Sequence, residues 1–265
     1  MDLATTQPQR DLSEILTPSS LCFIRTGAMR LTHGSGDYAI VDANHVLFGA
    51  PAAPVRPLTD HCCCTIVQFS AVALNEPALR IRLVSPLLYI RHWMLLQRAH
   101  HRRHSVGTTE ADALELLGDV IREPAFRDWQ SSVSADETQR RRRTIALHVT
   151  AVLHASLSNP LSLESVARSA SLSRFTLSRL FSEYAGVSMR VYYRRLRLRN
   201  ALDAMLDKRI DLTAIATNLG FSDQAHFTNA FRAEYGMSPS DIRRAMKGNN
   251  LQASFASDCY DDPGE

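Results

Sequence analysis

Two segments in the second half of the chain carry polar side chains whose chemistry suits hydrogen bonds to nucleic acid. Arginine, glutamine and asparagine form paired hydrogen bonds with base edges, while serine, threonine and arginine also bind phosphate oxygens. The outward-facing candidates are Arg174, Phe175, Ser178 and Arg179 in the first segment, and Gln224, Ala225, His226, Thr228 and Asn229 in the second. Arg179 is the strongest single candidate for a base contact. Phe175 has two open roles, in the core beside Leu177 or against a base.

The two segments belong to an internal repeat, which predicts two helix-turn-helix units. Each copy has the pattern of a short helix, from Leu163 or Leu212, a tight turn, and a second helix capped by Ser173 or Ser222. The offset between the copies is 49 residues up to that serine and 50 after it, so we expect one extra residue inside the second helix region of copy two. The matching positions are Val166-Ala167, Leu172-Ser173, Leu177, Phe181, Gly186 and Ser188 in copy one, and Ile215-Ala216, Phe221-Ser222, Phe227, Phe231, Gly236 and Ser238 in copy two.

A long helix is expected between the copies, from about Met189 to Asp207. At about 1.5 Å per residue it would be a rigid spacer of roughly 28 Å, near the ~34 Å between successive major grooves on one face of B-DNA. Two recognition helices on such a spacer could enter adjacent grooves of one duplex. The arginines on or near this helix that offer phosphate contacts are Arg190, Arg194, Arg195, Arg197 and Arg199.

The net charge of +3 hides a strong asymmetry along the chain. Residues 139–247 hold 18 basic against 8 acidic residues, residues 1–138 hold 12 against 15, and residues 248–265 hold 4 acidic residues and no basic one. A polyanion partner for the second half accounts for this, and a solvated helical surface is the alternative. The run Arg140–Arg143 leaves a similar choice open, between a nucleic-acid arm and a solvated start to a helix.

Residues 144–247 resemble the DNA-binding domain of the AraC/XylS family of bacterial transcription regulators. The resemblance lies in Ile215 to Arg232, in Tyr235-Gly236-Met237-Ser238-Pro239, and in Leu196 to Ala201, which matches the family's central helix. It implies seven helices, base contacts from both recognition helices and control of transcription at promoters. Double-stranded promoter DNA is therefore the expected partner, and the resemblance alone adds RNA polymerase. By position it carries base contact onto Phe175, Ser178 and Arg179, and onto the five candidates of the second segment.

The first half has the pattern of short strands followed by two helices. The β-type runs are Leu21–Arg25, Ala28–Thr32, Tyr38–Val41, Val46–Phe48 and Thr65–Phe69, and they predict a small antiparallel sheet or barrel. Ser85-Pro86 predicts a helix start, and Gly107 would end that helix, with Thr108 or Thr109 capping the next. The pattern is similar to the cupin-like sensor domains placed before this DNA-binding domain, which implies effector sensing or dimerisation.

Six segments are expected along the chain. They are a flexible arm at 1–18, a cupin-like β sensor domain at 19–75, a helical hairpin that could dimerise at 76–130, a linker at 131–139, the DNA-binding domain at 140–248 and an acidic disordered tail at 249–265. The fold class is therefore α+β: a small cupin-like barrel with a helical hairpin, then an all-α domain of two helix-turn-helix units joined by a long helix. We expect a homodimer gated by a small-molecule effector or another signal. Without an apolar run of 18 residues or a secretory signal, we expect it in the cytoplasm and not in a membrane.

Other chemistry is weaker in this sequence. Cys62-Cys63-Cys64 is spaced too closely for a usual zinc site, so packed or surface thiols are favoured over redox sensing or metal binding. His100 and His104 have helical i, i+4 spacing, but the surrounding arginines favour a solvated basic face. With scattered barrel histidines and no nucleophile–base pair, we expect no catalytic site, no cofactor and no metal. The alternatives to a specific regulator are a non-specific nucleoid-type DNA binder and, less favoured, a cupin enzyme with a helical accessory domain.

Overall fold

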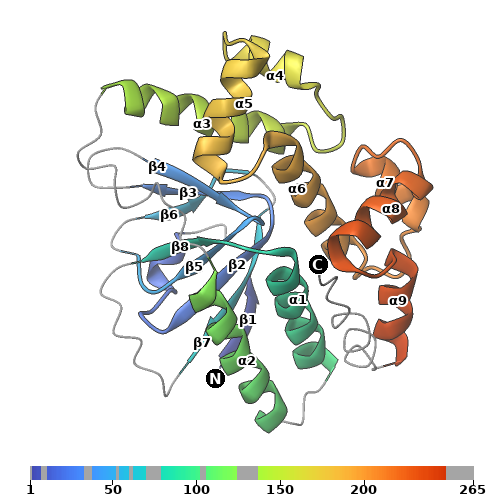
Figure 1. Cartoon of the computed structure of the whole chain (residues 1–265). Helices are drawn as coiled ribbons and strands as arrows, with labels where there is room; N and C mark the ends of the chain where they lie inside the picture. The colour runs from blue at the N-terminus through green and yellow to red at the C-terminus, as the bar shows by residue number, and fades with distance from the viewer. Residues whose placement is uncertain are drawn as a thin grey trace, which may run out of the picture.

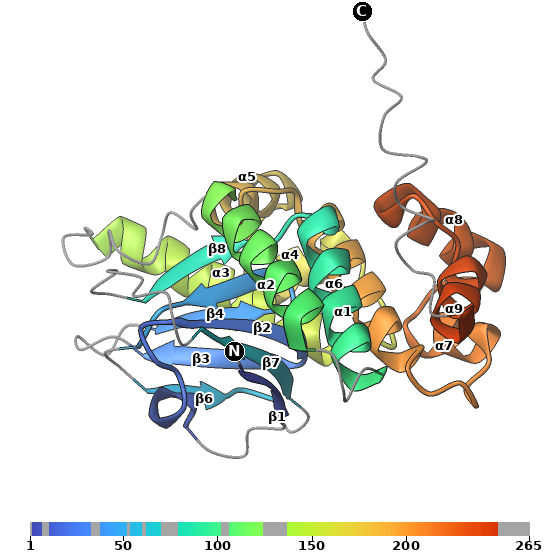
Figure 2. The same cartoon turned by 90° about the horizontal axis from the view of Figure 1, so that it is seen from below.

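The structure is a computed structural model that describes residues 2–6, 11–32, 38–51, 54–59, 62–69, 79–101, 106–123 and 137–248. Strands dominate the described first half of the chain, and the second half is helical (Figure 1). Helices 86–101 and 106–122 cover one face of the larger sheet, and helices 212–218, 224–235 and 239–248 form a separate group beyond them (Figure 2). Among the described residues, no helix has the length and apolar character needed to cross a membrane.

The described strands form two antiparallel sheets. The larger has the order β1 (Asp2–Thr6), β7 (Cys63–Gln68), β2 (Ser20–Thr26), β5 (His45–Phe48) and β8 (Arg80–Leu83), and the smaller has the order β4 (Tyr38–Asp42), β3 (Ala28–Thr32) and β6 (Val55–Pro57). The five strand runs predicted from the sequence are confirmed as β2, β3, β4, β5 and β7. The described strands stay in two open sheets and do not close into the expected barrel.

Strand β2 explains how the two sheets pack, because its side chains alternate between two cores. Leu21 and Phe23 face a core shared with the helices, while Cys22 and Ile24 face a core between the two sheets. The larger sheet is therefore the middle layer of the first half. An apolar run with no polar face is what such a doubly covered strand requires.

The flexible arm expected at residues 1–18 is wrong for the part of that segment which the structure describes. Asp2–Thr6 forms β1 and pairs along β7 at the edge of the larger sheet. A short 3-10 helix, η1 (Leu12–Glu14), follows, capped by the side chain of Asp11. Leu12 and Leu16 are buried between the sheets. These two leucines at i, i+4 spacing outweigh the polar composition around them.

The helical hairpin is present as α1 (Pro86–His101) and α2 (Val106–Arg122). The predicted start of α1 is confirmed, with the Ser85 hydroxyl accepting a hydrogen bond from the Leu88 amide at 3.2 Å. The predicted break at Gly107 is wrong, because α2 already includes Gly107 and both threonines after it. A single glycine costs a helix only about 1 kcal/mol, and the following apolar stripe outweighs it.

The second half consists of the seven helices that the resemblance implies. They are α3 (Glu137–Ala155), α4 (Leu163–Ser169), α5 (Arg174–Ala185), α6 (Met189–Ala204), α7 (Leu212–Asn218), α8 (Gln224–Tyr235) and α9 (Pro239–Gly248). The long helix between the copies is confirmed as α6, which ends three residues before the expected Asp207. We call α4 with α5 unit one, and α7 with α8 unit two.

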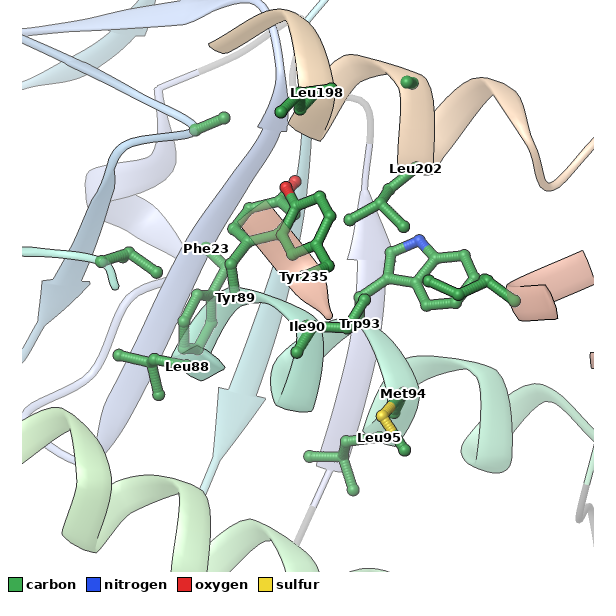
Figure 3. Close-up of a cluster of buried hydrophobic side chains, with 14 of the residues drawn as sticks. Phe23, Leu88, Tyr89, Ile90, Trp93, Met94, Leu95, Leu198, Leu202 and Tyr235 are labelled. Atoms are coloured by element: carbon green, nitrogen blue, oxygen red, sulfur yellow. The ribbon is translucent and has the colours of Figure 1, made fainter. Parts of the chain in front are cut away.

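The two halves of the chain share one hydrophobic core. Phe23 of β2 and Trp93 of α1 are buried in it beside Leu198 and Leu202 of α6 and Tyr235 of α8 (Figure 3). Each large side chain removed from water in this way contributes about 1.5–3 kcal/mol. Apolar packing therefore fixes both the connecting helix and the second helix of unit two to the first half.

Candidate nucleic-acid interface

Unit one is built by two capped helices that meet through small and apolar side chains. Ser162 caps α4, and the Ser173 hydroxyl caps α5 by accepting a hydrogen bond from the Thr176 amide at 3.2 Å. Leu177 and Phe181 are buried, and Ala167 of α4 is buried against them. Because these residues occupy the inner face of α5, the side chains between them point outward.

The four candidates on α5 all lie at the surface, to different extents. The Phe175 side chain is 74% exposed, so its core role is excluded. The Arg174 guanidinium lies 4.9 Å from the centre of its ring. Arg179 is 72% exposed, and its Nε lies 3.6 Å from Oε1 of Glu183 one turn further on. Ser178 is half-buried.

Unit two repeats this frame with one difference in the turn. The N-cap of α8 is Asp223, whose carboxylate accepts a hydrogen bond from the His226 amide at 2.7 Å, and the predicted cap at Ser222 is wrong by one residue. Both recognition helices have 12 residues. The extra residue of copy two therefore lies in the turn before α8. The prediction that it lies inside the helix region is wrong.

The candidates on α8 are exposed except for Thr228, which is half-buried. Two of them are held by neighbours: Gln224 Oε1 accepts a hydrogen bond from Thr213 of α7 at 2.9 Å, and His226 Nδ1 lies 3.1 Å from the Ser222 hydroxyl. Ala225 and Asn229 lie beside them on the outer face. These contacts orient the amide and the imidazole before any ligand binds.

The arginines of α6 have four different environments, although the sequence predicts phosphate contacts for all of them. Arg190 is exposed near the start of the helix. Arg194 and Arg195 both donate to the carboxylate of Glu234 on α8, at 2.9 and 2.7 Å. The Arg197 guanidinium lies 4.6 Å from the centre of the Phe221 ring and donates to the Gly220 carbonyl.

Arg199 faces away from this surface, and the expectation of a phosphate contact from it is wrong. Its side chain is 0% exposed and donates to the carbonyls of Ala43 and Val84 and, at 2.8 Å, to Oδ1 of Asn44. The guanidinium also lies 4.8 Å from the centre of the Tyr89 ring. A buried arginine needs such partners, because a buried charge without them is very costly.

A hollow of about 630 Å³ lies between the two units. Five of the predicted residues line it beside Ser188 and Phe221: Ser178 of α5, Arg190, Arg194 and Arg197 of α6, and His226 of α8. The surface around it can accept and donate hydrogen bonds and carries an exposed arginine. These properties suit a polar, anionic partner that spans both units.

Sequence reasoning missed a buried polar cluster that attaches α3 and α6 to the first half. The carboxylate of Asp42, at the end of β4, lies 2.8 Å from His154 Nε2 of α3 and 3.0 Å from His45 Nδ1, and it also accepts a hydrogen bond from the Tyr192 hydroxyl of α6. Burial alone would raise the pKa of Asp42, but the hydrogen bonds from the two histidines outweigh burial and hold that pKa well below its usual value. A second link joins Arg25 of β2 to the Asp203 carboxylate of α6.

Part of this junction has a signal in the sequence. Tyr192, Leu196, Arg199 and Asp203 recur every three or four residues, so they lie on one face of α6. The tyrosine and leucine predict that this face is buried, and the charged members then require buried partners. Nothing in the sequence identifies those partners, because Asp42 and Ala43 lie about 150 residues earlier.

Cys62 and Cys64 of the cysteine run lie in the core between the two sheets, and Cys63 lies near Arg25 and Asp203 of the junction. Cys62 and Cys64 are buried, and burial raises the pKa of the Cys62 thiol to about 12. Burial also raises the pKa of Cys63 to about 11. Thiols with such values are protonated at neutral pH and are poor nucleophiles or metal ligands. The histidine pair considered for metal binding falls outside the described side chains, since His104 and the side chain of His100 are not described.

The second half of the chain is similar in sequence to helix-turn-helix domains of known regulatory proteins. A helix-turn-helix domain family matches residues 166–245. The HTH-type transcriptional activator RhaS of Escherichia coli O139:H28 is 40% identical over 85 residues, which cover 32% of this chain and 31% of RhaS. The regulatory protein PocR of Salmonella typhimurium is 33% identical over 103 residues, covering 39% of this chain and 34% of PocR. The chain thus spans about a third of the length of these relatives.

Solved structures that are similar to this chain also match only part of it. A transcriptional regulator of Chromobacterium violaceum with an AraC-type DNA-binding domain is 27% identical, with a TM-score of 0.36, over 42% of this chain and 96% of that one. The DNA-binding domain of AdpA, solved with a target DNA, is 23% identical with a TM-score of 0.38, over 40% of this chain and 96% of that one.

Proposed function

Because residues 166–245 match a helix-turn-helix domain family and form two helix-turn-helix units, we propose that this protein is a sequence-specific DNA-binding regulator of transcription of the AraC/XylS family. The observation that carries the proposal is the pairing of two recognition helices of equal length around one hollow, each with its polar face outward. A long helix fixes their separation, as binding in adjacent major grooves requires. RhaS, which is described as a transcriptional activator, and the regulatory protein PocR support the same function.

Each recognition helix reads one groove in this proposal. In unit one, Arg179 pairs with a base, with Arg174, Phe175 and Ser178 around it. In unit two the readers are Gln224, Ala225, His226, Thr228 and Asn229, with the glutamine and asparagine suited to adenine. Arg190 binds the backbone between the grooves. Arg195 shares the carboxylate of Glu234 with Arg194. It therefore contributes mainly by orienting α8 and adds a weaker phosphate contact.

The first half acts as a cupin-like sensor and as the dimerisation domain. An apolar stripe on α2, where Leu114 and Ile121 are 46% and 49% exposed at i, i+7 spacing, supports self-association through the hairpin. The effector is a small molecule or another signal received in this half, and RNA polymerase is the partner at the promoter. Replacing both side chains by lysine is expected to leave a folded monomer in sedimentation experiments, and an unchanged dimer would contradict this role of α2.

The function is tested first by selecting genomic fragments on the full chain in vitro, at about 150 mM salt. A few enriched sites that share two short blocks about one helical turn apart are expected. A flat profile, with equal affinity for every duplex, would support the non-specific DNA binder instead. Adding a cell extract as a source of effector then tests whether specific binding needs a signal.

Arg179→Ala tests the assignment of the strongest reader. We expect a loss of about 1–3 kcal/mol on the selected site and a much smaller loss on scrambled DNA, because only the correct site offers the base. Arg122→Ala, which removes an exposed arginine from α2, is the control and should change neither affinity. Equal losses on both duplexes would make Arg179 a phosphate contact.

A further inference from the structure

The arginine run Arg140–Arg143 lies in the first turns of α3, outside the matched helix-turn-helix domain. Arg140 and Arg141 are exposed, and neither forms an ion pair with any residue that the structure describes. Arg142 is half-buried, and its Nη1 lies 3.2 Å from Oε2 of Glu183. Within the part of the chain that the structure describes, the run therefore presents two exposed arginines without an ion-pair partner at one end of the helix.

Glu183 connects this run to the recognition helix of unit one. One carboxylate oxygen lies near Arg142 of α3, and the other lies 3.6 Å from Nε of Arg179 on α5. Helix α5 packs across α3, so the contact joins two neighbouring elements (Figure 1). Both ion pairs are largely exposed and add little to stability. Their consequence is positional, because they set the arginine run beside the proposed base reader.

The run lies outside the hollow between the units. Ser178 lines that hollow together with residues of α6 and unit two, whereas Arg179 and Glu183 lie further round α5, on the side that meets α3. When α5 enters a major groove, one phosphate backbone of the duplex lies on each side of the helix. In the proposed function Arg190 binds the backbone on the side toward unit two, and the other backbone lies toward the start of α3.

We propose that Arg140, Arg141 and Arg142, which we call the basic flank, bind duplex phosphates beyond the groove entered by α5, on the side away from unit two. This inference rests on the proposed function and adds a third contact to the two recognition helices. Phosphates compete with Glu183 for Arg142, while Arg140 and Arg141 bind without losing an ion pair to any described residue. The contact is independent of base sequence, because it involves only the backbone.

The test compares the full-length wild type with the double variant R140Q/R141Q on the selected duplex and on a scrambled duplex, over a range of salt concentrations. The slope of log K against log salt is negative, and every phosphate that the variant no longer binds should make it less steep by about 1. We therefore expect the magnitude of the slope to fall by about 2, with equal fold-losses in affinity on both duplexes. The matched control is R56Q/R122Q, which removes two exposed arginines from the first half and should leave the slope unchanged.

A second measurement locates the contact. Shortening the duplex on the unit-one side should weaken wild-type binding to the level of the double variant, and the double variant should not respond to this truncation. Shortening on the unit-two side should affect both proteins equally. Equal salt slopes for the wild type and the double variant, or equal responses to the first truncation, would overturn the basic flank. If the wild type binds no duplex specifically, the proposed function itself fails, and the two failures are thereby distinguished.

Discussion

The two helix-turn-helix units have the same backbone frame and opposite surface chemistry. Both recognition helices have 12 residues and end at a glycine in the left-handed region, Gly186 and Gly236, with φ of 71° and 75°. The exposed face of α5 is arginine-rich and aromatic, whereas that of α8 carries an amide, an imidazole and a second amide. Buried and turn residues set the frame, and exposed residues set the recognition. The two properties can therefore change independently.

The units also differ in how they are attached to the first half. Beside unit one, α3 and α6 reach the first half through buried polar groups around Asp42 in addition to the apolar contacts of α6, whereas α8 of unit two packs against α1 through an apolar cluster that contains Trp93 and Tyr235. Polar attachment depends on protonation and geometry, and apolar attachment depends on packed volume. The two units are thus attached to the first half by contacts of partly different chemistry.

Asp42→Asn should produce the largest effect, because it removes one partner of a buried charged cluster. We expect a loss of about 3–5 kcal/mol in the free energy of unfolding at pH 7, measured by urea denaturation. Because the folded pKa of Asp42 is lowered, its contribution is present above the unfolded value and is lost as pH falls through the folded pKa. The difference between wild type and variant should therefore shrink in acid below about pH 4.

Tyr235→Phe is the matched change at the attachment of unit two. It keeps the buried ring and removes only the hydroxyl, so we expect a small change in stability with no dependence on pH. A loss below about 1 kcal/mol for Asp42→Asn, or a difference that persists in acid, would contradict the polar attachment beside unit one.

Gly220→Ala, in the turn of unit two, should be the next largest change. Gly220 has a φ of 69° in the turn before α8, and a Cβ there would overlap the ring of Pro160. Left-handed strain and overpacking together should cost about 2–4 kcal/mol, measured as a lower denaturation midpoint. Gly236→Ala has similar strain but open space around the Cβ, so a comparable loss there would show that strain alone decides the effect.

The two caps should differ in their pH dependence. Ser173→Ala is expected to cost about 1 kcal/mol at every pH, since a hydroxyl cap does not titrate in this range. Hydrogen bonds to the His226 amide and the Ser222 hydroxyl lower the pKa of Asp223, so Asp223→Ala should destabilise the protein above the unfolded pKa and have less effect in acid. Thermal melts of both variants at neutral and acid pH measure this, and parallel pH profiles would contradict the assignment of Asp223 as the cap.

Ser171→Gly should have the smallest effect, and it should be favourable. Ser171 occupies in unit one the place of Gly220 and has a φ of 53°. Glycine removes about 1 kcal/mol of backbone strain, but it also increases the entropy of the unfolded chain, which offsets part of that gain. We therefore expect the free energy of unfolding in urea to rise by about 0.5 kcal/mol. A loss of stability would mean that the serine side chain holds this turn.

The sequence predicts the parts of the fold that depend on neighbouring residues. The repeat, the turns and the cap at Ser173 follow from local patterns, and both recognition helices were found from them. The shift of the second cap from Ser222 to Asp223 was missed, because either side chain can cap a helix and only the backbone geometry selects one.

The junction between the halves could not be predicted, because its partners come from distant parts of the chain. Arg199 looks like one more surface arginine in a basic helix, and only the carbonyls of Ala43 and Val84 show that it is buried. Asp42 appears in sequence as a turn residue before Ala43-Asn44. The local signal for both is weaker than the tertiary contact that decides their environment.

The buried guanidinium of Arg199 limits how this chain can be recombined. A fusion that carries residues 137–248 behind an unrelated sensor would keep the arginine but lose the three oxygen atoms that bind it, and α6 would expose Leu198 and Leu202. Such a chimera would need a compensating change at Arg199 before it could fold well. The second half of this protein is thus not an interchangeable module, and the buried face of α6 must vary together with the residues of the first half that it contacts.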